Sequence, residues 1–255
     1  METNYAEVTE IAGEPITAEQ LFRLNHRYAW AVGYCGGRDV VECGCGTGPG
    51  LGLLQGASRT FEAGDISPLM VEVARRHYGS RVRVSQFNAE TLPFASASKD
   101  VVLLFEAIYY LPDASRFVRE CRRVLRPGGY MLIVTANKDL WDFHPSPHAY
   151  RYYGVLELSE LFAEYGFECE FFGFQDVRRT GWRQRLLRPV KRFVVAIGLM
   201  PKTMAGKRWI KRIVFGPSLS MPAELSPGYS LELLERIDAG CQNEHHKIIY
   251  CAARL

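Results

Sequence analysis

The glycine-dense stretch at residues 40–50 (VVECGCGTGPG) constrains the fold of this chain more than any other segment. An apolar run passes there directly into a turn with a glycine at every second position, and a helical pattern follows. In an open parallel sheet, ligands bind outside the carboxyl ends of the strands, where glycines let the backbone approach closely. The segment therefore predicts a strand, a turn that binds a nucleotide-type ligand, and a helix.

Short apolar runs and helical patterns alternate over residues 40–135, which is typical of parallel βαβ units. Strands are predicted at residues 39–42, 59–64, 81–86, 100–105, 129–135, 167–174 and 247–252. Helices are predicted at residues 17–32, 50–55, 68–78, 114–125 and 156–165, with Thr17 as the N-cap of the first. The predicted fold is α/β: a Rossmann-like, doubly wound, mostly parallel sheet of seven strands.

The glycine turn does not fit the dinucleotide fingerprint GxGxxG, which needs Gly or Ala at its third marked position. The four registers that start at the glycines of the turn place other residues there, namely Pro49, Leu51, Leu53 and Gln55. A nicotinamide dinucleotide is therefore not the expected ligand. The pattern that remains is ExGxGxG, which begins at Glu42 and ends at Gly48.

Four further segments follow this pattern in order: FEAGDISPLM at 61–70, NAETLPF at 88–94, DVV at 100–102 and RVLRPGG at 123–129. With the glycine turn they resemble the class I S-adenosylmethionine-dependent methyltransferases of the methyltransferase-11 type. The resemblance covers roughly residues 20–174 at the spacing usual in that family. It implies a Rossmann-like fold and S-adenosylmethionine as the cofactor.

The resemblance also implies which residues contact the cofactor. Asp65, 21 residues after Gly44 at a predicted strand end, would bind the ribose hydroxyls, and Glu42 would lie near the positively charged methionine end. Asn88 stands where the family usually has Asp, which alters the adenine contact, since an amide both donates and accepts. The complete predicted set is Arg27, Tyr28, Glu42, Gly44, Gly46, Gly48, Asp65, Ile66, Met70, Asn88, Ala89, Glu90 and Phe105.

A narrower similarity lies outside the core. The motif HRYxxA at 26–31, with TxNK at 135–138 and YY at 152–153, resembles methyltransferases of bacterial surface-polysaccharide and sugar pathways. In such enzymes the Arg-Tyr helix covers the carboxylate end of the cofactor, which would make residues 1–38 an N-terminal helical lid. The alternative is an amphipathic helix in which Tyr28 is simply buried.

Methyl transfer to an alcohol needs a group that accepts the proton of the hydroxyl. His144 and His148 lie in the loop after the predicted fifth strand, where the mouth of the site is expected, and His144 is favoured as the base. Both could instead be solvated loop residues. Tyr109 could contact a sugar or aromatic acceptor or pack in the core. Asp139, Asp142 and His144 could instead hold a divalent cation, but no metal is predicted.

Charge is strongly segregated, although the net charge is only +3. Residues 177–223 hold twelve Lys or Arg and no Asp or Glu, which leaves 19 basic residues to face 28 acidic ones elsewhere. With interleaved aromatics, such a stretch lies on anionic membranes or binds phosphates. Nucleic acid ranks lower because no nucleic-acid-binding module is present. The alternative is a cap whose charged side chains are solvated.

The predicted domains are the lid (1–38), a cofactor-binding core (39–174), a helical basic cap (175–246) and the final strand of the core (247–255). No apolar run reaches the roughly 20 residues that span a bilayer, and no secretory signal is expected. The expected location is the cytoplasm, or peripherally the inner face of the membrane. The oligomeric state is open.

The predicted reaction is S-adenosylmethionine-dependent O-methylation of a sugar, glycoconjugate or other small polar acceptor. Two enzymatic alternatives remain, a small-molecule N-methyltransferase and a natural-product O-methyltransferase. The alternative of another class is a non-catalytic cofactor-binding protein with a basic interaction surface.

Overall fold

The computed structural model describes residues 11–179, 218–229 and 231–255. The helices in these residues are α1 (Ala18–Cys35), α2 (Leu51–Ala57), α3 (Pro68–Tyr78), α4 (Ala114–Val124) and α5 (Val155–Glu164), with short 3-10 helices η2 (Ile108–Tyr110) and η3 (Val177–Arg179). The strands are β1 (Pro15–Thr17), β2 (Asp39–Cys43), β3 (Thr60–Asp65), β4 (Arg83–Gln86), β5 (Lys99–Phe105), β6 (Leu125–Ala136), β7 (Glu168–Asp176), β8 (Ser218–Ser220), β9 (Glu235–Ile237) and β10 (His246–Arg254).

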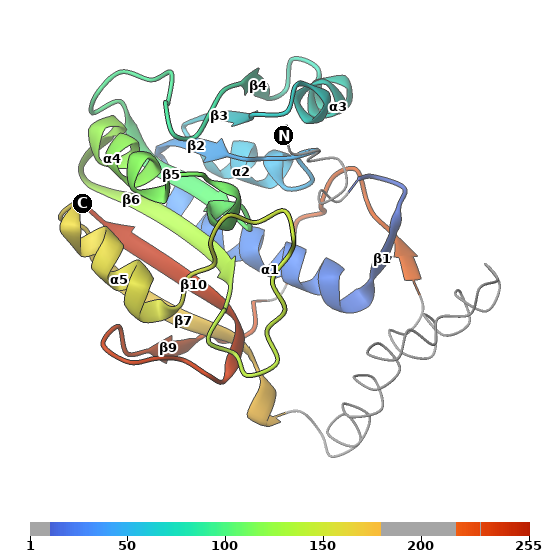
Figure 1. The fold of residues 1–255 in the computed structure, drawn as a ribbon. Helices are drawn as coiled ribbons and strands as arrows, with labels where there is room; N and C mark the ends of the chain where they lie inside the picture. The colour runs from blue at the N-terminus through green and yellow to red at the C-terminus, as the bar shows by residue number, and fades with distance from the viewer. Residues whose placement is uncertain (1–10, 180–217, 230) are drawn as a thin grey trace.

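The main sheet of the described residues has the strand order β4-β3-β2-β5-β6-β10-β7-β9 (Figure 1). Strands β2 to β6 pair in parallel, whereas β10 runs antiparallel to both of its neighbours, β6 and β7. The chain order reverses between β2 and β5, because β3 and β4 lie on one side of β2 while β5 and β6 lie on the other. A crevice at the carboxyl ends of these two strands is where open α/β sheets bind ligands. The predicted doubly wound, mostly parallel sheet is confirmed.

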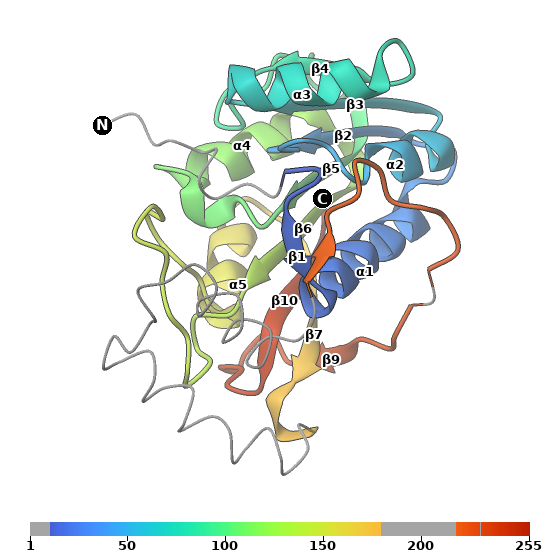
Figure 2. The same ribbon diagram turned by 90° about the vertical axis from the view of Figure 1, so that its right-hand side faces the viewer.

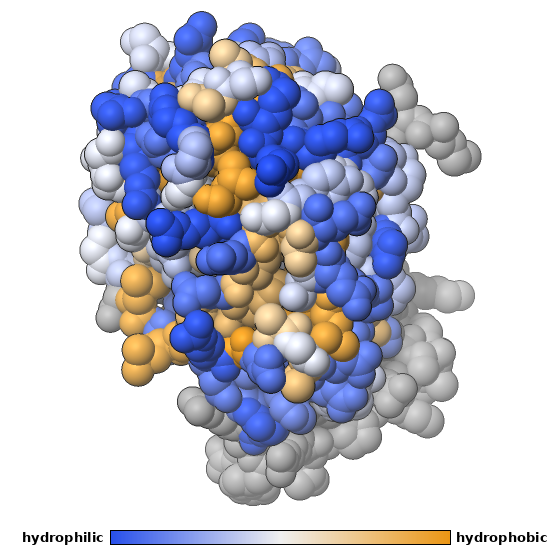
Figure 3. Space-filling view, turned by 90° about the vertical axis from the view of Figure 1, so that its left-hand side faces the viewer, coloured by the Kyte–Doolittle hydropathy of each residue, from blue (hydrophilic) through white to orange (hydrophobic). Residues whose placement is uncertain are grey.

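Two hydrophobic cores lie on opposite faces of this sheet. Val40 packs with side chains of α1, α2 and α3, whereas its neighbour Val41 packs with those of α4 and α5. This alternation follows from the period of two along a strand, and near-continuous apolar strands are typical of sheets covered on both faces. Figure 2 shows the sheet between α1 and α2 on one side and α4 and α5 on the other. Figure 3 shows the side of the molecule that lies to the left in Figure 1, near the C-terminus; hydrophilic side chains cover most of it, and apolar ones form a strip between them.

Helix α1 starts where the sequence predicts. The Thr17 hydroxyl accepts a hydrogen bond from the Gln20 N–H at 3.1 Å, and the Gln20 side chain accepts the Thr17 N–H at 3.0 Å. This reciprocal arrangement is a capping box, and it satisfies two backbone donors at the helix start. The helix buries Leu24, Tyr28 and Ala31 against the sheet, so the predicted lid forms part of a core layer.

We expect Thr17→Ala to lower the free energy of unfolding by about 1 kcal/mol, because it removes the acceptor for the Gln20 N–H. Denaturant unfolding of this variant and of Thr17→Ser, which keeps the hydroxyl, measures the effect. Equal stability of the Ala variant and the parent chain would show that the cap contributes nothing.

The sheet has eight strands in the described residues, one more than the seven predicted. The additional strand, β9, lies in the segment predicted as cap and pairs antiparallel with β7. Its three residues lie in the polar sequence ELLERIDAG, which carries no alternating apolar pattern, so periodicity could not identify it. A short strand of this kind covers the edge of β7, which would otherwise offer unpaired backbone groups. A second unpredicted pairing joins β1 to β8.

Other described residues of the predicted cap also contact the cofactor-binding core. The Leu225 N–H donates to the Pro49 carbonyl at 2.7 Å, and Glu224 binds Arg81, just after α3, at 2.8 Å. The central part of the basic stretch, residues 180–217, lies outside the described residues, so the helical cap and its membrane contact remain predictions. Among the helices that the structure does describe, none is long and apolar enough to cross a bilayer.

Candidate functional site

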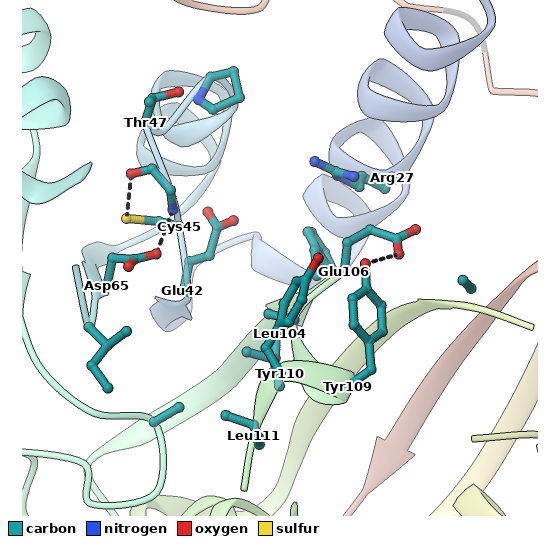
Figure 4. A pocket seen from close by; sticks show the side chains of 18 of the residues that line it. Arg27, Glu42, Cys45, Thr47, Asp65, Leu104, Glu106, Tyr109, Tyr110 and Leu111 are labelled. Atoms are coloured by element: carbon teal, nitrogen blue, oxygen red, sulfur yellow. Dashed lines mark hydrogen bonds between the residues drawn. The ribbon is translucent and has the colours of Figure 1, made fainter. Parts of the chain in front are cut away.

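A cavity of about 400 Å³ lies at the carboxyl ends of β2, β3 and β5 and beside α1 (Figure 4). The loop after β4 and the start of β10 complete its wall. Twelve of the predicted site residues line it: Arg27, Tyr28, Glu42, Gly44, Gly46, Asp65, Ile66, Asn88, Ala89, Glu90, Phe105 and Tyr109. The structure thus brings together residues from five separate segments at the switch point of the sheet.

The glycine turn is held against the end of β3 by Asp65. The Gly46 N–H donates to Asp65 Oδ2 at 2.9 Å, and the Ser67 N–H donates to Oδ1 at 2.8 Å. Gly44 and Gly46 have φ angles of 64° and 56°, in the left-handed region that favours glycine. Burial raises the pKa of Asp65, while the backbone N–H donors act to lower it. The carboxylate is therefore fixed at the cavity wall with lone pairs still available for hydroxyl donors.

Glu42 and Tyr28 form a buried pair in the wall of the cavity. The Tyr28 hydroxyl donates to Glu42 Oε1 at 2.6 Å, and Glu42 Oε2 has no hydrogen-bond partner among the described residues. A Cβ on Gly50 would lie 2.3 Å from the Tyr28 ring, so only glycine lets Tyr28 lie on the turn. Tyr28 is thus both buried and part of the wall. An unsatisfied buried carboxylate oxygen fits a positively charged ligand group such as an ammonium.

Burial raises the pKa of Glu42 to about 7, against the opposing effects of the Tyr28 hydroxyl and the Arg27 charge. Because the folded-state pKa lies above the unfolded value, the protein without cofactor should lose stability as the pH rises from about 4.5 to about 7. A bound cation favours the carboxylate, so cofactor binding should release a proton and weaken as the pH falls below about 7.

Calorimetric titration of the cofactor in buffers of different ionisation enthalpy measures the number of protons that binding releases. Glu42→Gln should abolish proton release and flatten the pH dependence of the dissociation constant between about pH 5.5 and 7.5. An unchanged proton count in this variant would mean that another group titrates.

The wall on the side of β4 is formed by Asn88, Ala89 and Glu90. The Asn88 side-chain oxygen accepts the Glu90 N–H at 2.8 Å, which turns its NH₂ group toward other partners. Glu90 Oε1 accepts the Asp113 N–H at 2.6 Å and so ties this loop to the start of α4. Asn88 therefore offers a donor where the family's Asp offers an acceptor.

Glu106 lies at the carboxyl end of β5 and is not among the predicted site residues. The Tyr109 hydroxyl donates to Glu106 Oε2 at 3.0 Å, and the Tyr109 ring stacks on Tyr152 at 4.5 Å between centroids. Glu106 has a φ of 50°, a backbone conformation that is uncommon outside glycine and clusters at functional sites. The signal in the sequence was a charged residue placed directly after the apolar run 101–105.

Four predicted site residues do not line the cavity. The Gly48 carbonyl accepts the Tyr78 hydroxyl at 2.7 Å and so faces α3, and Met70 is buried within α3. His144 is exposed and His148 half-buried in the loop between β6 and α5. Neither histidine is among the residues that line the cavity, and their place at its mouth stays a prediction.

The sequence offered Asp139, Asp142 and His144 as possible ligands of a divalent cation. In the described residues these three side chains do not form a cluster that could hold a metal ion. The one group there with suitable spacing is Asp176, Glu235 and His246, and none of these three residues lines the cavity. The Arg178 guanidinium donates to both Asp176 oxygens at 2.9 to 3.1 Å and already neutralises this carboxylate. All seven cysteines lie in the described residues and are free thiols.

The fold and site define an α/β protein with a cavity at the switch point of its sheet, where buried carboxylates suit a cationic, hydroxyl-bearing ligand. A methyltransferase domain family model matches residues 41–133. A probable S-adenosylmethionine-dependent methyltransferase of Mycolicibacterium smegmatis is 40% identical over 152 residues, which are 58% of this chain and 56% of that protein. The chain thus spans about half the length of this mycobacterial relative.

The O-methyltransferase resE of Aspergillus sclerotiorum is 30% identical over 249 residues, 91% of this chain and 85% of that protein. The crystal structure of YcgJ from Bacillus subtilis shares the fold with a TM-score of 0.58 and 19% identity, and the match covers 90% of this chain and 98% of that one. The chain belongs to the S-adenosylmethionine-dependent methyltransferases, and S-adenosylmethionine is its cofactor.

Proposed function

We propose that this protein transfers a methyl group from S-adenosylmethionine to a hydroxyl oxygen of a small polar acceptor. The observation that carries the proposal is the Glu106–Tyr109 pair, a carboxylate and a hydroxyl 3.0 Å apart in the same cavity as the cofactor-binding residues. Similarity to an O-methyltransferase over 91% of the chain supports it.

The cofactor would be held along β2 and β3. Asp65 would accept two ribose hydroxyls, Glu42 Oε2 would accept the ammonium, and the backbone of Gly44 and Gly46 would contact the methionine part. Arg27, which lines the cavity from α1, would bind the cofactor's carboxylate. The bound cofactor supplies a methyl group on a positively charged sulfur that leaves as a neutral thioether.

Glu106 would accept the proton that the acceptor hydroxyl loses. Burial holds the pKa of Tyr109 well above its usual value, so its hydroxyl stays protonated and orients the Glu106 carboxylate by donating to it. This assigns Tyr109 a positioning role, in addition to the acceptor contact expected from the sequence. His144 and His148 are not among the residues that line this cavity, whereas Glu106 is.

The acceptor surface favours a flat or ring-shaped molecule. Tyr109, Tyr110 and Leu111 line the cavity next to Glu106, and aromatic side chains stack on sugars and on aromatic rings alike. We keep a sugar or glycoconjugate as the proposed acceptor, with an aromatic natural product as the alternative.

Incubation with methyl-labelled cofactor and a panel of sugars, phenols and amines tests the function. Label on an oxygen is the expected result, and chelator should not reduce the rate. Label on nitrogen would favour the N-methyltransferase alternative. Cofactor binding with no transfer to any acceptor would favour a non-catalytic binding protein.

We also propose a cytoplasmic protein that docks peripherally on anionic membranes through residues 177–223, on the ground of their twelve basic and no acidic side chains. Each Lys or Arg near such a surface contributes on the order of 1 kcal/mol, which salt weakens. Co-sedimentation should show binding to anionic but not neutral vesicles, and Gln at Lys207, Arg208, Lys211 and Arg212 together should reduce it. Indifference to lipid charge would leave the stretch as a solvated surface.

A further inference from the structure

Charge is unevenly distributed along the cavity wall. Glu42 and Asp65 lie in the half assigned to the cofactor, which is itself a cation. Arg23 on α1 and Lys247 at the start of β10 line the cavity as well, and both side chains are only about one-third exposed, at 31% each. Two partly buried cations at one end of a pocket require anionic charge nearby.

In this structure the carboxylate of Glu19 supplies the negative charge. The Arg23 guanidinium and the Lys247 ammonium both bind Glu19 Oε1, at 2.5 and 2.7 Å. These hydrogen bonds lower the pKa of Glu19 to about 2, although its partial burial acts in the opposite direction. Glu19 does not itself line the cavity and is half-exposed, at 49%, so its side chain has solvent to move into.

A second hydrogen bond, to Gln175, fixes the orientation of the Arg23 side chain. Its Nε donates to the Gln175 side-chain oxygen at 2.8 Å, while its Nη2 donates to the Glu19 carboxylate. One carboxylate oxygen therefore already occupies the point where the two cations converge. Two cations with one shared counter-charge leave a net positive charge at this end of the cavity.

We propose that the methyl acceptor carries a carboxylate or phosphate group, and that Arg23 and Lys247 bind this group in place of Glu19. The inference rests on the proposed function, since it assigns the acceptor of the same cavity. An acid held at this end would extend its uncharged part toward Tyr109 and Glu106, which line the same cavity. The acceptor class is then a hydroxylated organic acid or phosphate ester.

Calorimetry with small probes tests the site without requiring methyl transfer. Benzoate, phenyl phosphate and uncharged benzamide are titrated into protein loaded with S-adenosylhomocysteine. Benzoate or phenyl phosphate should bind at least about tenfold more tightly than benzamide. The tighter of the two acids distinguishes a carboxylate acceptor from a phosphate one.

Substitutions of the cations and of Glu19 should change the affinity for the acidic probe in opposite directions, which a purely structural role of these residues would not produce. Arg23→Gln and Lys247→Gln should each weaken binding of the acidic probe about tenfold or more, whereas Glu19→Gln should tighten it severalfold by removing the competing carboxylate. Arg76→Gln, which breaks an exposed pair on α3, is the matched control and should change nothing.

Equal binding of benzamide and both acids would overturn the inference, as would unchanged acid binding in Arg23→Gln and Lys247→Gln. A weaker cofactor affinity in these two variants would also overturn it, because the cofactor's own carboxylate would then be the group that Arg23 and Lys247 bind. Acid binding without methyl transfer to any hydroxyl would contradict the proposed function and leave this site standing.

Discussion

Replacing Glu106 by Gln should lower kcat by about 10²- to 10⁴-fold while the affinity for S-adenosylmethionine stays within about twofold. The amide keeps the size of the side chain and the left-handed backbone, and it still accepts the Tyr109 hydroxyl. It cannot accept a proton from the acceptor. Single-turnover transfer of the labelled methyl group measures kcat, and calorimetry measures cofactor binding.

Two companion variants separate proton transfer from packing. Tyr109→Phe removes the hydrogen bond at 3.0 Å but keeps the ring on Tyr152, so we expect a smaller loss, about tenfold, and a shifted pH profile. Glu72→Gln on the exposed face of α3 serves as the control. An unchanged kcat in Glu106→Gln would exclude Glu106 as the base and return attention to the histidines of the loop between β6 and α5.

Asp65→Ala should raise the dissociation constant of S-adenosylmethionine by about 10- to 150-fold, or about 1.5 to 3 kcal/mol. The substitution removes the acceptor of the ribose hydroxyls and also the anchor of the Gly46 and Ser67 N–H groups. The turn that carries the methionine end would therefore lose its support at the same time. Calorimetry with the methylated and the demethylated cofactor gives both constants.

Asp65→Asn distinguishes the two contributions. Its single oxygen can hold one backbone N–H, so the turn keeps part of its support, while the charge is lost. An affinity loss in Asp65→Asn close to that in Asp65→Ala would assign the effect to the carboxylate charge, and an intermediate loss would assign part of it to the turn. Normal cofactor affinity in Asp65→Ala, with an unchanged unfolding midpoint, would contradict the assignment of Asp65.

Local patterns determined much of this protein. The strand–glycine turn–helix unit, the Thr17 cap and the acidic strand end at Asp65 follow from contacts between residues close in sequence, because periodicity, capping and turn chemistry act over a few residues. For that reason the parallel sheet could be predicted, whereas the cofactor-binding set was predicted from the family resemblance; the structure gathers most of that set at one cavity.

Tertiary structure alone decided the end of the cavity that we assign to the acceptor. Glu19 and Lys247 are 228 residues apart, and they meet because β10 inserts between β6 and β7 and brings its first residues to the start of α1. Glu106 became a candidate base only through the Tyr109 hydroxyl of η2, which donates to it. Such groupings depend on how distant segments pack, since a side chain's neighbours across a sheet leave no pattern in the sequence around it.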